Sequence, residues 1–289
     1  MELKHIATRT GRLSTFLKQE LGLSTGLMNK LKWSEKLFVN GIPRHADFAV
    51  EIGDVITADL DEPKPEYPAE HDPFTILYED EHILAVDKPA GMLIHPSRSR
   101  LTGTLANRVI GYYARTGQAC AFHPITRLDR DTFGIVLLAK NAHIHGILNQ
   151  LHTEGKIQKT YHALVFGGPD ETEGVIDAPI ARRPLPSLLR YVNQYGKPSQ
   201  TVFQVLARKD AVTKLALQPI TGRTHQLRVH CAHMGYPILG DPQYGNEASQ
   251  AYSNTLGLTS QLLCAKSLQF PHPVTGEEMK ILSELDVEK

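Results

Sequence analysis

The sequence is poor in cysteine and has no long apolar run. Three cysteines occur in 289 residues, at positions 120, 231 and 264, and no two form a CxxC pair. This odd, widely spaced set argues against a disulfide framework and a cysteine-rich zinc site, so we expect buried small side chains. Apolar runs such as residues 135–139 are far below the ~18 residues that span a bilayer. The amino terminus lacks an apolar signal core, so we expect a cytoplasmic protein without a membrane segment.

The sequence also lacks net charge, since 31 Lys and Arg balance 31 Asp and Glu. Its apolar content of 41% and charged content of 21% are those of a soluble globular protein. The charges are unevenly distributed. Residues 1–46 carry 8 basic against 3 acidic residues, and residues 121–230 carry 14 against 8. Residues 61–81 carry 1 against 8, and residues 241–289 carry 3 against 7. Two basic regions separated by acidic ones are consistent with a basic face.

The amino-terminal 60 residues contain signals for two short helices and a few strands. Apolar side chains at 13, 16, 17 and 21 predict a helix that ends at Gly22, and a second helix is expected at 25–33. Residues 37–42 predict a strand entering an Asn40-Gly41 turn, and Gly53 precedes a last strand. This order resembles the small S-four-like RNA-binding domain, named after a ribosomal protein. Its phosphate contacts would then include Lys30, Lys32 and Arg44; the alternative is an ordinary solvated face.

Residues 61–73 hold four prolines and five carboxylates without periodicity, which predicts an extended acidic linker. Three regions follow from this: an RNA-binding domain at 1–60, a linker at 61–73 and a larger domain at 74–289. In the larger domain, strands are expected at 83–87, 159–166, 201–207 and 212–218, and helices around 144–151 and 224–234.

The most informative stretch is 126–134, Thr-Arg-Leu-Asp-Arg-Asp-Thr-Phe-Gly. Two carboxylates alternate with two arginines just before the apolar run 135–139. A salt-bridged turn would explain the charges, but their position between Leu128 and a glycine-headed strand favours a site in which pairing or burial tunes a carboxylate.

Four separated pieces stand out: 87–91 (Asp-Lys-Pro-Ala-Gly), the segment around Asp129, 159–161 (Lys-Thr-Tyr) and 221–228 (Thr-Gly-Arg-Thr-His-Gln-Leu-Arg). They resemble the KPxG, HRLDRxTSG, KxY and TGRxHQIR motifs of the RluA-type pseudouridine synthases, in the same order. Thr126 and Phe133 depart from the usual His and Ser. The resemblance implies an α+β fold, with a mixed, mainly antiparallel sheet flanked by helices and loops, and a small S-four-like α/β domain.

It also implies isomerisation of uridines in RNA to pseudouridine, without cofactor or metal. Asp129 matches the catalytic aspartate, which attacks the ribose or the base, or stabilises charge as the bond opens. Arg223 matches the arginine that pairs with it, because a guanidinium holds its charge and binds both carboxylate oxygens. Tyr161 matches the active-site tyrosine, which would stack on the extruded base and could also move a proton. Core packing for Tyr161 and a surface position for Arg223 are the alternatives.

Two further residues are candidates for RNA contacts. Arg127 would act as a wedge or phosphate contact for the flipped nucleotide, or form an ion pair with Asp131. Lys88 would shape its turn or touch RNA. We expect a monomer. Because of the amino-terminal domain, we expect it to act on large-subunit rRNA rather than tRNA.

Two other classes of protein remain as alternatives. A non-catalytic RNA-binding or ribosome-assembly protein would use residues 10–60 alone and would not need Asp129, Tyr161 and Arg223. A metal-dependent hydrolase would use His225, His230 and His233 with Cys231. The five-residue spacing of the first two histidines does not place both rings on one helical face, however.

Overall fold

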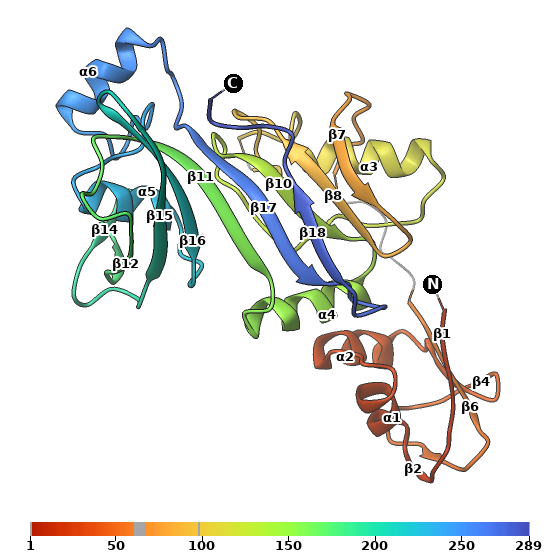
Figure 1. Cartoon of the computed structure of the whole chain (residues 1–289). Coiled ribbons are helices and arrows are strands. Elements are labelled where there is room, and N and C mark those ends of the chain that lie inside the picture. The colour runs from red at the N-terminus through yellow and green to blue at the C-terminus, as the bar shows by residue number, and fades with distance from the viewer. Residues whose placement is uncertain (1, 61–66, 98, 289) are drawn as a thin grey trace.

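The structure, a computed structural model, describes residues 2–60, 67–97 and 99–288 and has a small and a large part (Figure 1). The small, amino-terminal part contains a four-stranded sheet in the order β1-β6-β3-β4. Its elements are β1 (Glu2–Ile6), β2 (Gly11–Arg12), α1 (Leu13–Gln19), α2 (Thr25–Trp33), β3 (Leu37–Val39), β4 (Ile42–Pro43), β5 (Ala49–Val50) and β6 (Val55–Asp59).

Local signals explain the helix and hairpin of the small part. α2 begins after Ser24, whose Oγ accepts a hydrogen bond from the Leu27 backbone N–H at 3.2 Å, as a capping serine does. Asn40 and Gly41 join β3 to β4 with φ angles of 54° and 77°, the conformation of an Asn-Gly hairpin turn. Phe16 on α1 is fully buried in the core between helices and sheet. Both predicted helices, the predicted turn and the predicted last strand are confirmed.

The large part is built on a ten-stranded sheet whose main order is β12-β15-β16-β11-β17-β10-β8-β7, with β18 on β17 and β9 on β10. Its strands are β7 (Thr75–Glu79), β8 (Ile83–Lys88), β9 (His123–Pro124), β10 (Phe133–Ala139), β11 (Gln158–Phe166), β12 (Glu173–Asp177), β15 (Gln200–Lys209), β16 (Val212–Pro219), β17 (Leu263–Pro271) and β18 (Glu278–Leu282). β13 (Ile180–Arg182) and β14 (Arg190–Val192) form a separate hairpin. Among the described residues, β10 and β17 pair in parallel and the other strand pairs are antiparallel. The sheet is therefore mixed and mainly antiparallel, as predicted.

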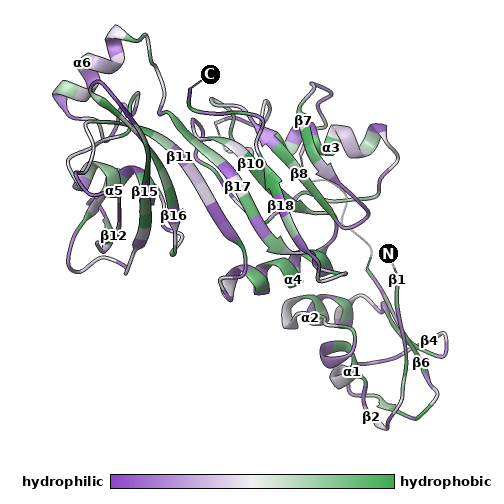
Figure 2. Cartoon of the chain, in the orientation of Figure 1, coloured by the Kyte–Doolittle hydropathy of each residue, from purple (hydrophilic) through white to green (hydrophobic). Residues whose placement is uncertain are grey.

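Helices cover both faces of this sheet. The helices of the large part are α3 (Leu105–Arg115), α4 (Ala142–Thr153), α5 (Gln226–His233) and α6 (Glu247–Thr255). Successive side chains of a strand point to opposite faces, and in β8 Ile83 packs with Leu148 of α4 while Leu84 packs with Val109 of α3. All six residues of β8 are buried, and the strand is largely green in Figure 2.

Packing and hydrogen bonds join the small part and the described residues of the linker to the large part. Ala142 of α4 packs against the core of the small part. The second half of the predicted linker lies on α3: Asn107 Nδ2 donates to Pro68 O at 2.8 Å, and Arg108 Nη1 donates to Pro73 O at 3.0 Å. A Cβ at Gly111 would lie 1.8 Å from Glu70 O, so glycine permits this close approach. The first half of the predicted linker, residues 61–66, lies outside the described residues.

Two points differ from the sequence-based expectation. The helix expected at 224–234 begins only at Gln226, because His225 has φ 58°, a left-handed conformation that does not continue into an α-helix. The helices α3 and α6 were not predicted.

Within the described ranges, no helix combines the length and apolar character that crossing a membrane requires.

Candidate active site

A cavity of about 510 Å³ brings together segments that are distant in the chain. Its lining includes Arg127 and Asp129 from the loop before β10, Tyr161 from β11 and Arg223 from the segment before α5. The volume lies within the ~300–1,000 Å³ usual for ligand sites. All four of these sequence-predicted residues therefore lie around the same cavity.

A buried lysine fastens the loop that carries Asp129. Lys88, at the end of β8, is 0% exposed, and its Nζ donates to the carbonyl oxygens of Pro89, Met92 and Arg130, each at 2.9 Å. Burial lowers the pKa of Lys88 to about 8, while the charges of Asp131 and Asp129 act in the opposite direction. Lys88 shapes the turn, which was one of its two predicted roles. Its predicted contact with RNA is wrong, because the residue has no exposed surface.

The arginine that pairs with Asp129 is Arg228, in the first turn of α5. Arg228 Nη1 lies 3.2 Å from Asp129 Oδ2. The same guanidinium donates from Nε and Nη2 to the two oxygens of Asp241, at 2.7 and 2.8 Å, and from Nη2 to Gln243 Oε1 at 2.8 Å. Burial lowers the pKa of Arg228, but the hydrogen bonds and charges of Asp241 and Asp129 raise it overall. Arg228 therefore presents a fixed positive charge to Asp129.

The predicted pairing of Arg223 with Asp129 is wrong. Arg223 is exposed, and its Nε donates to the backbone carbonyl of Pro198 at 3.2 Å. The left-handed residue His225 separates Arg223 from α5, whereas Arg228 lies on the helix and is 4% exposed. The sequence contained two signals for Arg228: a second arginine in the same motif, and the Asp241 carboxylate to neutralise it.

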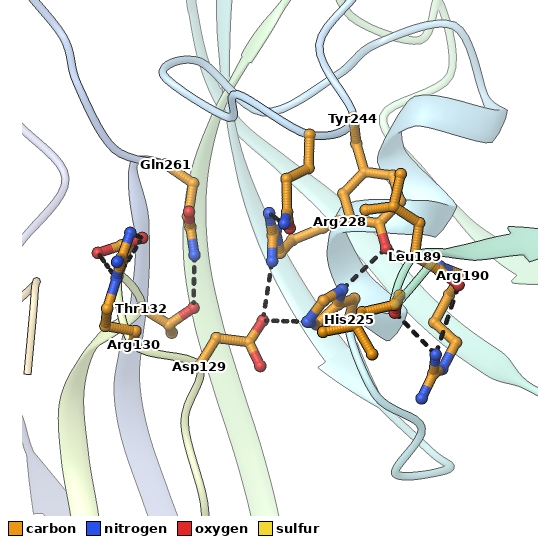
Figure 3. A network of polar contacts seen from close by, with 12 residues as sticks. Asp129, Arg130, Thr132, Leu189, Arg190, His225, Arg228, Tyr244 and Gln261 are labelled. Carbon is orange, nitrogen blue, oxygen red and sulfur yellow. Dashed lines mark hydrogen bonds and ion pairs between the residues drawn. The ribbon is translucent and has the colours of Figure 1, made fainter. Parts of the chain in front are cut away.

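The sequence analysis also missed the pairing of His225 with Tyr244. His225 Nε2 lies 3.8 Å from Asp129 Oδ2, and its Nδ1 lies 2.8 Å from the Tyr244 hydroxyl. Figure 3 shows His225 and Arg228 reaching the same oxygen of Asp129, while the other oxygen points away from both. Burial lowers the pKa of His225 and outweighs the opposing effect of Asp129. The imidazole is therefore neutral near pH 7.

Tyr161 lies on β11, where the register with β17 shifts between Thr160 and Tyr161. Its ring packs against two apolar clusters, one that includes Ala265 of the neighbouring strand β17 and one that includes Leu217 of the neighbouring strand β16. The ring also lines the cavity. Burial, and then the charge of Asp129, raise the pKa of Tyr161 well above its ordinary value. The side chain thus offers an aromatic surface and a protonated hydroxyl to the cavity.

Comparisons with known proteins agree with this fold and cavity. Residues 82–233 match the family model described as RNA pseudouridylate synthase. The RNA pseudouridine synthase YjbO of Bacillus subtilis is 37% identical over 269 residues, which cover 92% of this chain and 93% of that protein. Ribosomal large subunit pseudouridine synthase C of Vibrio cholerae is 32% identical over 290 residues, which cover 95% of this chain and 90% of that protein. The chain belongs to the RNA pseudouridylate synthase family.

Solved structures support the same membership. The human protein RNA pseudouridylate synthase domain containing 1 has a TM-score of 0.60 and 27% sequence identity, over 74% of this chain and 84% of that one. The chain is thus an RNA pseudouridine synthase, an enzyme that isomerises uridine in RNA. The predicted family, α+β fold class and enzyme class are confirmed.

Among the charged residues that line the cavity of the synthase, basic ones outnumber acidic ones. Asp129 is the one acidic residue among the lining residues that the structure describes, and Arg127, Lys159, Arg223 and Arg228 also line it. Lys159 Nζ lies 2.8 Å from His152 Nε2, and burial lowers the pKa of both groups. This balance suits the phosphates of an RNA strand.

The other predicted RNA contacts are exposed. Arg127 is at the surface, and the ion pair considered for it forms instead between Arg130 and Asp131, at 2.8 Å. In the small part, Lys30 and Lys32 lie in the last turn of α2. The guanidinium of Arg44 lies 4.4 Å from the centroid of the Phe48 ring. All three of these small-part residues are accessible to a nucleic acid.

Two of the three histidines of the metal-site alternative have other contacts in the synthase. His225 faces Tyr244, and His230 lies 2.9 Å from Thr201 Oγ1 and 3.0 Å from the carbonyl oxygen of Ala178. In the part of the chain that the structure describes, no three His, Cys, Asp or Glu side chains are arranged to hold a metal ion. Cys231 and Cys264 are buried, and Cys120 is half-buried.

Proposed function

We propose that Asp129 is the catalytic carboxylate of this synthase and that the target uridine enters the cavity after it leaves its stack. Enzymes that act on a base commonly extrude it in this way. The reaction breaks the bond between uracil N1 and ribose C1′, turns the base and joins C5 to C1′. C5 then loses its proton to solvent or a base, and N1 takes up one proton from the same source. Atoms and electrons balance without an oxidant or reductant. A carboxylate serves as nucleophile on the sugar or the base.

The observation that carries this proposal is the unequal environment of the two Asp129 oxygens. Oδ2 faces Arg228 Nη1 at 3.2 Å and His225 Nε2 at 3.8 Å. Oδ1 has no hydrogen-bond or ion-pair partner among the described residues, and Asp129 lines the cavity (Figure 3). One oxygen is held by a fixed positive charge and the other is available to the nucleotide. Tyr161 provides the aromatic face that replaces the stacking lost when the base leaves the RNA.

We assign the amino-terminal residues to substrate binding. In this proposal, residues 1–60 form an S-four-like RNA-binding domain in which Lys30, Lys32 and Arg44 contact phosphates. Residues 61–73 join it to the catalytic domain, residues 74–289, where Arg127 contacts the RNA beside the flipped nucleotide.

The proposed substrate is large-subunit rRNA. Two relatives, of Vibrio cholerae and Nitrosomonas europaea, are named as ribosomal large subunit pseudouridine synthases. We also propose that the enzyme acts as a monomer. Cysteine is scarce in this chain, with three in 289 residues, which fits a reducing compartment such as the cytoplasm.

Mapping of pseudouridines in total RNA tests the proposal. Cells that lack this protein are complemented with the unaltered gene, with Asp129→Asn or with Asp131→Asn. Asp131 is a matched control, because it lies two residues away and pairs with the exposed Arg130. We expect a set of rRNA sites to return with the unaltered protein and with Asp131→Asn, and to stay unmodified with Asp129→Asn. Sites that return with Asp129→Asn would exclude this carboxylate as the catalytic group. Dependent sites confined to tRNA would exclude the rRNA assignment.

A further inference from the structure

We propose that His225 is a positioning residue for Asp129: Tyr244 fixes the imidazole with its proton on Nε2, directed at Oδ2, so that Oδ1 is left to meet the nucleotide. This inference rests on the proposed role of Asp129. It adds His225 and Tyr244 to the residues that prepare the carboxylate.

The first argument comes from the hydrogen bonds of the Tyr244 hydroxyl. The backbone N–H of Arg190 donates to the Tyr244 hydroxyl oxygen at 2.9 Å. The hydroxyl's own proton still needs an acceptor, and a phenol carries one donor. His225 Nδ1, at 2.8 Å, is the acceptor within reach among the described residues. Nδ1 therefore carries the lone pair, and in a neutral imidazole the proton is then on Nε2.

The second argument comes from the opposite side of the ring. Nε2 faces Asp129 Oδ2 at 3.8 Å. A lone pair on Nε2 would repel the carboxylate, whereas an N–H there is attracted to it. Two independent contacts, one at each ring nitrogen, therefore select the same tautomer, as a second hydrogen bond commonly does for functional histidines.

The backbone of His225 supports a functional reason for this orientation. Four non-glycine residues of the described chain have a positive φ: Glu35, Asn40, Asp210 and His225. The first three are exposed, whereas His225 is partly buried and lines the cavity. Such strain is retained mainly where the surroundings impose it, often at active sites. The left-handed conformation directs the ring between Tyr244 and Asp129 just before α5 begins.

The charges around His225 come in both signs. Asp129 and Asp241 favour its protonation, whereas Arg228 and Arg190 oppose it, and burial is the largest influence and lowers the pKa. The ring is thus a neutral donor rather than a second cation. At 3.8 Å the contact with Oδ2 is longer than a hydrogen bond. Hydrogen bonds at active sites are commonly long until the substrate is bound, so we expect this contact to shorten in the complex with RNA.

The tautomer can be measured directly, without turnover. The protein is labelled with nitrogen-15 histidine, and the ring signals of His225 are assigned by their loss in His225→Gln. Between pH 7 and 8 we expect an unprotonated Nδ1 and a protonated Nε2. In Tyr244→Phe, which removes the donor to Nδ1, we expect a mixture of tautomers and a titration at higher pH. A proton on Nδ1 in the unaltered enzyme would overturn the proposal.

Kinetics under single-turnover conditions test the functional part. Tyr244→Phe should lower the rate at saturating RNA about five- to tenfold, the scale of removing one neutral hydrogen bond, with little change in RNA affinity. Tyr191→Phe is the matched control, because it removes a hydroxyl that accepts from Asn193 at 3.1 Å and does not line the cavity. It should leave the rate unchanged.

A matched pair at position 225 gives the second kinetic test. His225→Gln should retain more activity than His225→Leu, because glutamine keeps an N–H donor and leucine does not. Both variants bear the same backbone strain, so they can be compared directly. Equal rates for this pair, or an unchanged rate in Tyr244→Phe, would refute the positioning role. Because the tautomer is measured without turnover, an active Asp129→Asn would reject the proposed catalytic group separately.

Discussion

Replacement of Arg228 by lysine tests whether Arg228, rather than Arg223 in the same motif, supports Asp129 in the reaction. Arg228 binds Asp241 through Nε and Nη2, at 2.7 and 2.8 Å, and Asp129 through Nη1, at 3.2 Å. A lysine ammonium keeps the charge, but it is a single point and cannot reach both carboxylates with fixed geometry. Asp241 is fully buried, so we expect the ammonium to remain with it. Asp129 then has no fixed cation beside it.

The size of the effect follows from the interaction that this substitution removes. A hydrogen bond to a charged group contributes about 1.5–3 kcal/mol, and about 1.4 kcal/mol corresponds to a tenfold change. The side chain of Asp129 is 31% exposed, and water screens such an interaction in part. We therefore expect Arg228→Lys to lower the single-turnover rate by about tenfold, near the lower end of this range. Arg228→Ala is less informative, because removing one partner of a buried ion pair costs about 3–5 kcal/mol of stability.

The assay follows pseudouridine formation in a large-subunit rRNA fragment at saturating enzyme, together with a thermal melt of each variant. Arg223→Lys is the comparison, because Arg223 is exposed and its Nε donates to a backbone carbonyl. It should lose less activity than Arg228→Lys. If Arg223→Lys proved the slower enzyme, or Arg228→Lys kept the full rate while remaining folded, the pairing of Arg228 with Asp129 would not matter for the reaction.

Two further predictions concern the buried lysine and the small part. Lys88 has a pKa of about 8 in the folded protein, against an ordinary value of 10.5. Between pH 8 and 10.5, Lys88 is protonated in the unfolded chain and largely deprotonated in the folded protein. The unfolded chain therefore binds more protons, so the unfolding free energy rises with pH over this range. This contribution to stability is lost as the pH falls to about 8. The unfolding free energy of the unaltered protein, relative to Lys88→Met, should therefore rise by about 3 kcal/mol from pH 8 to 10.5 in denaturant titrations; a flat difference would contradict the burial argument. Replacement of Lys30, Lys32 and Arg44 by glutamine should reduce the salt dependence of RNA binding, by about 0.7–0.9 in log–log slope for each phosphate that is no longer neutralised. An unchanged slope would mean that this surface does not bind RNA.

Local signals allowed much of the small part and several strands of the large part to be predicted. The Asn40-Gly41 turn and the apolar spacing of α1 depend on neighbours within a few residues, and such short-range preferences are readable in sequence. The pattern failed for α3, whose capping box pairs Thr104 with Asn107 instead of the more common Glu or Gln. The pattern also misplaced the start of α5, because nothing in the neighbouring sequence indicates that His225 adopts a left-handed conformation.

The sequence by itself determined the family and the kinds of residue at the site, because motif order and spacing are properties of the chain. It placed Asp129, Tyr161 and the segment 221–228 together, and all of them line one cavity. Only the tertiary structure decided which arginine meets Asp129, since Arg223 and Arg228 are both plausible in the sequence. The direction of a side chain depends on the backbone and on distant partners. The left-handed conformation of His225 sets where α5 begins, and the ion pair with Asp241 fixes the side chain of Arg228. Likewise, only packing revealed that Lys88 is enclosed beneath the loop instead of facing RNA.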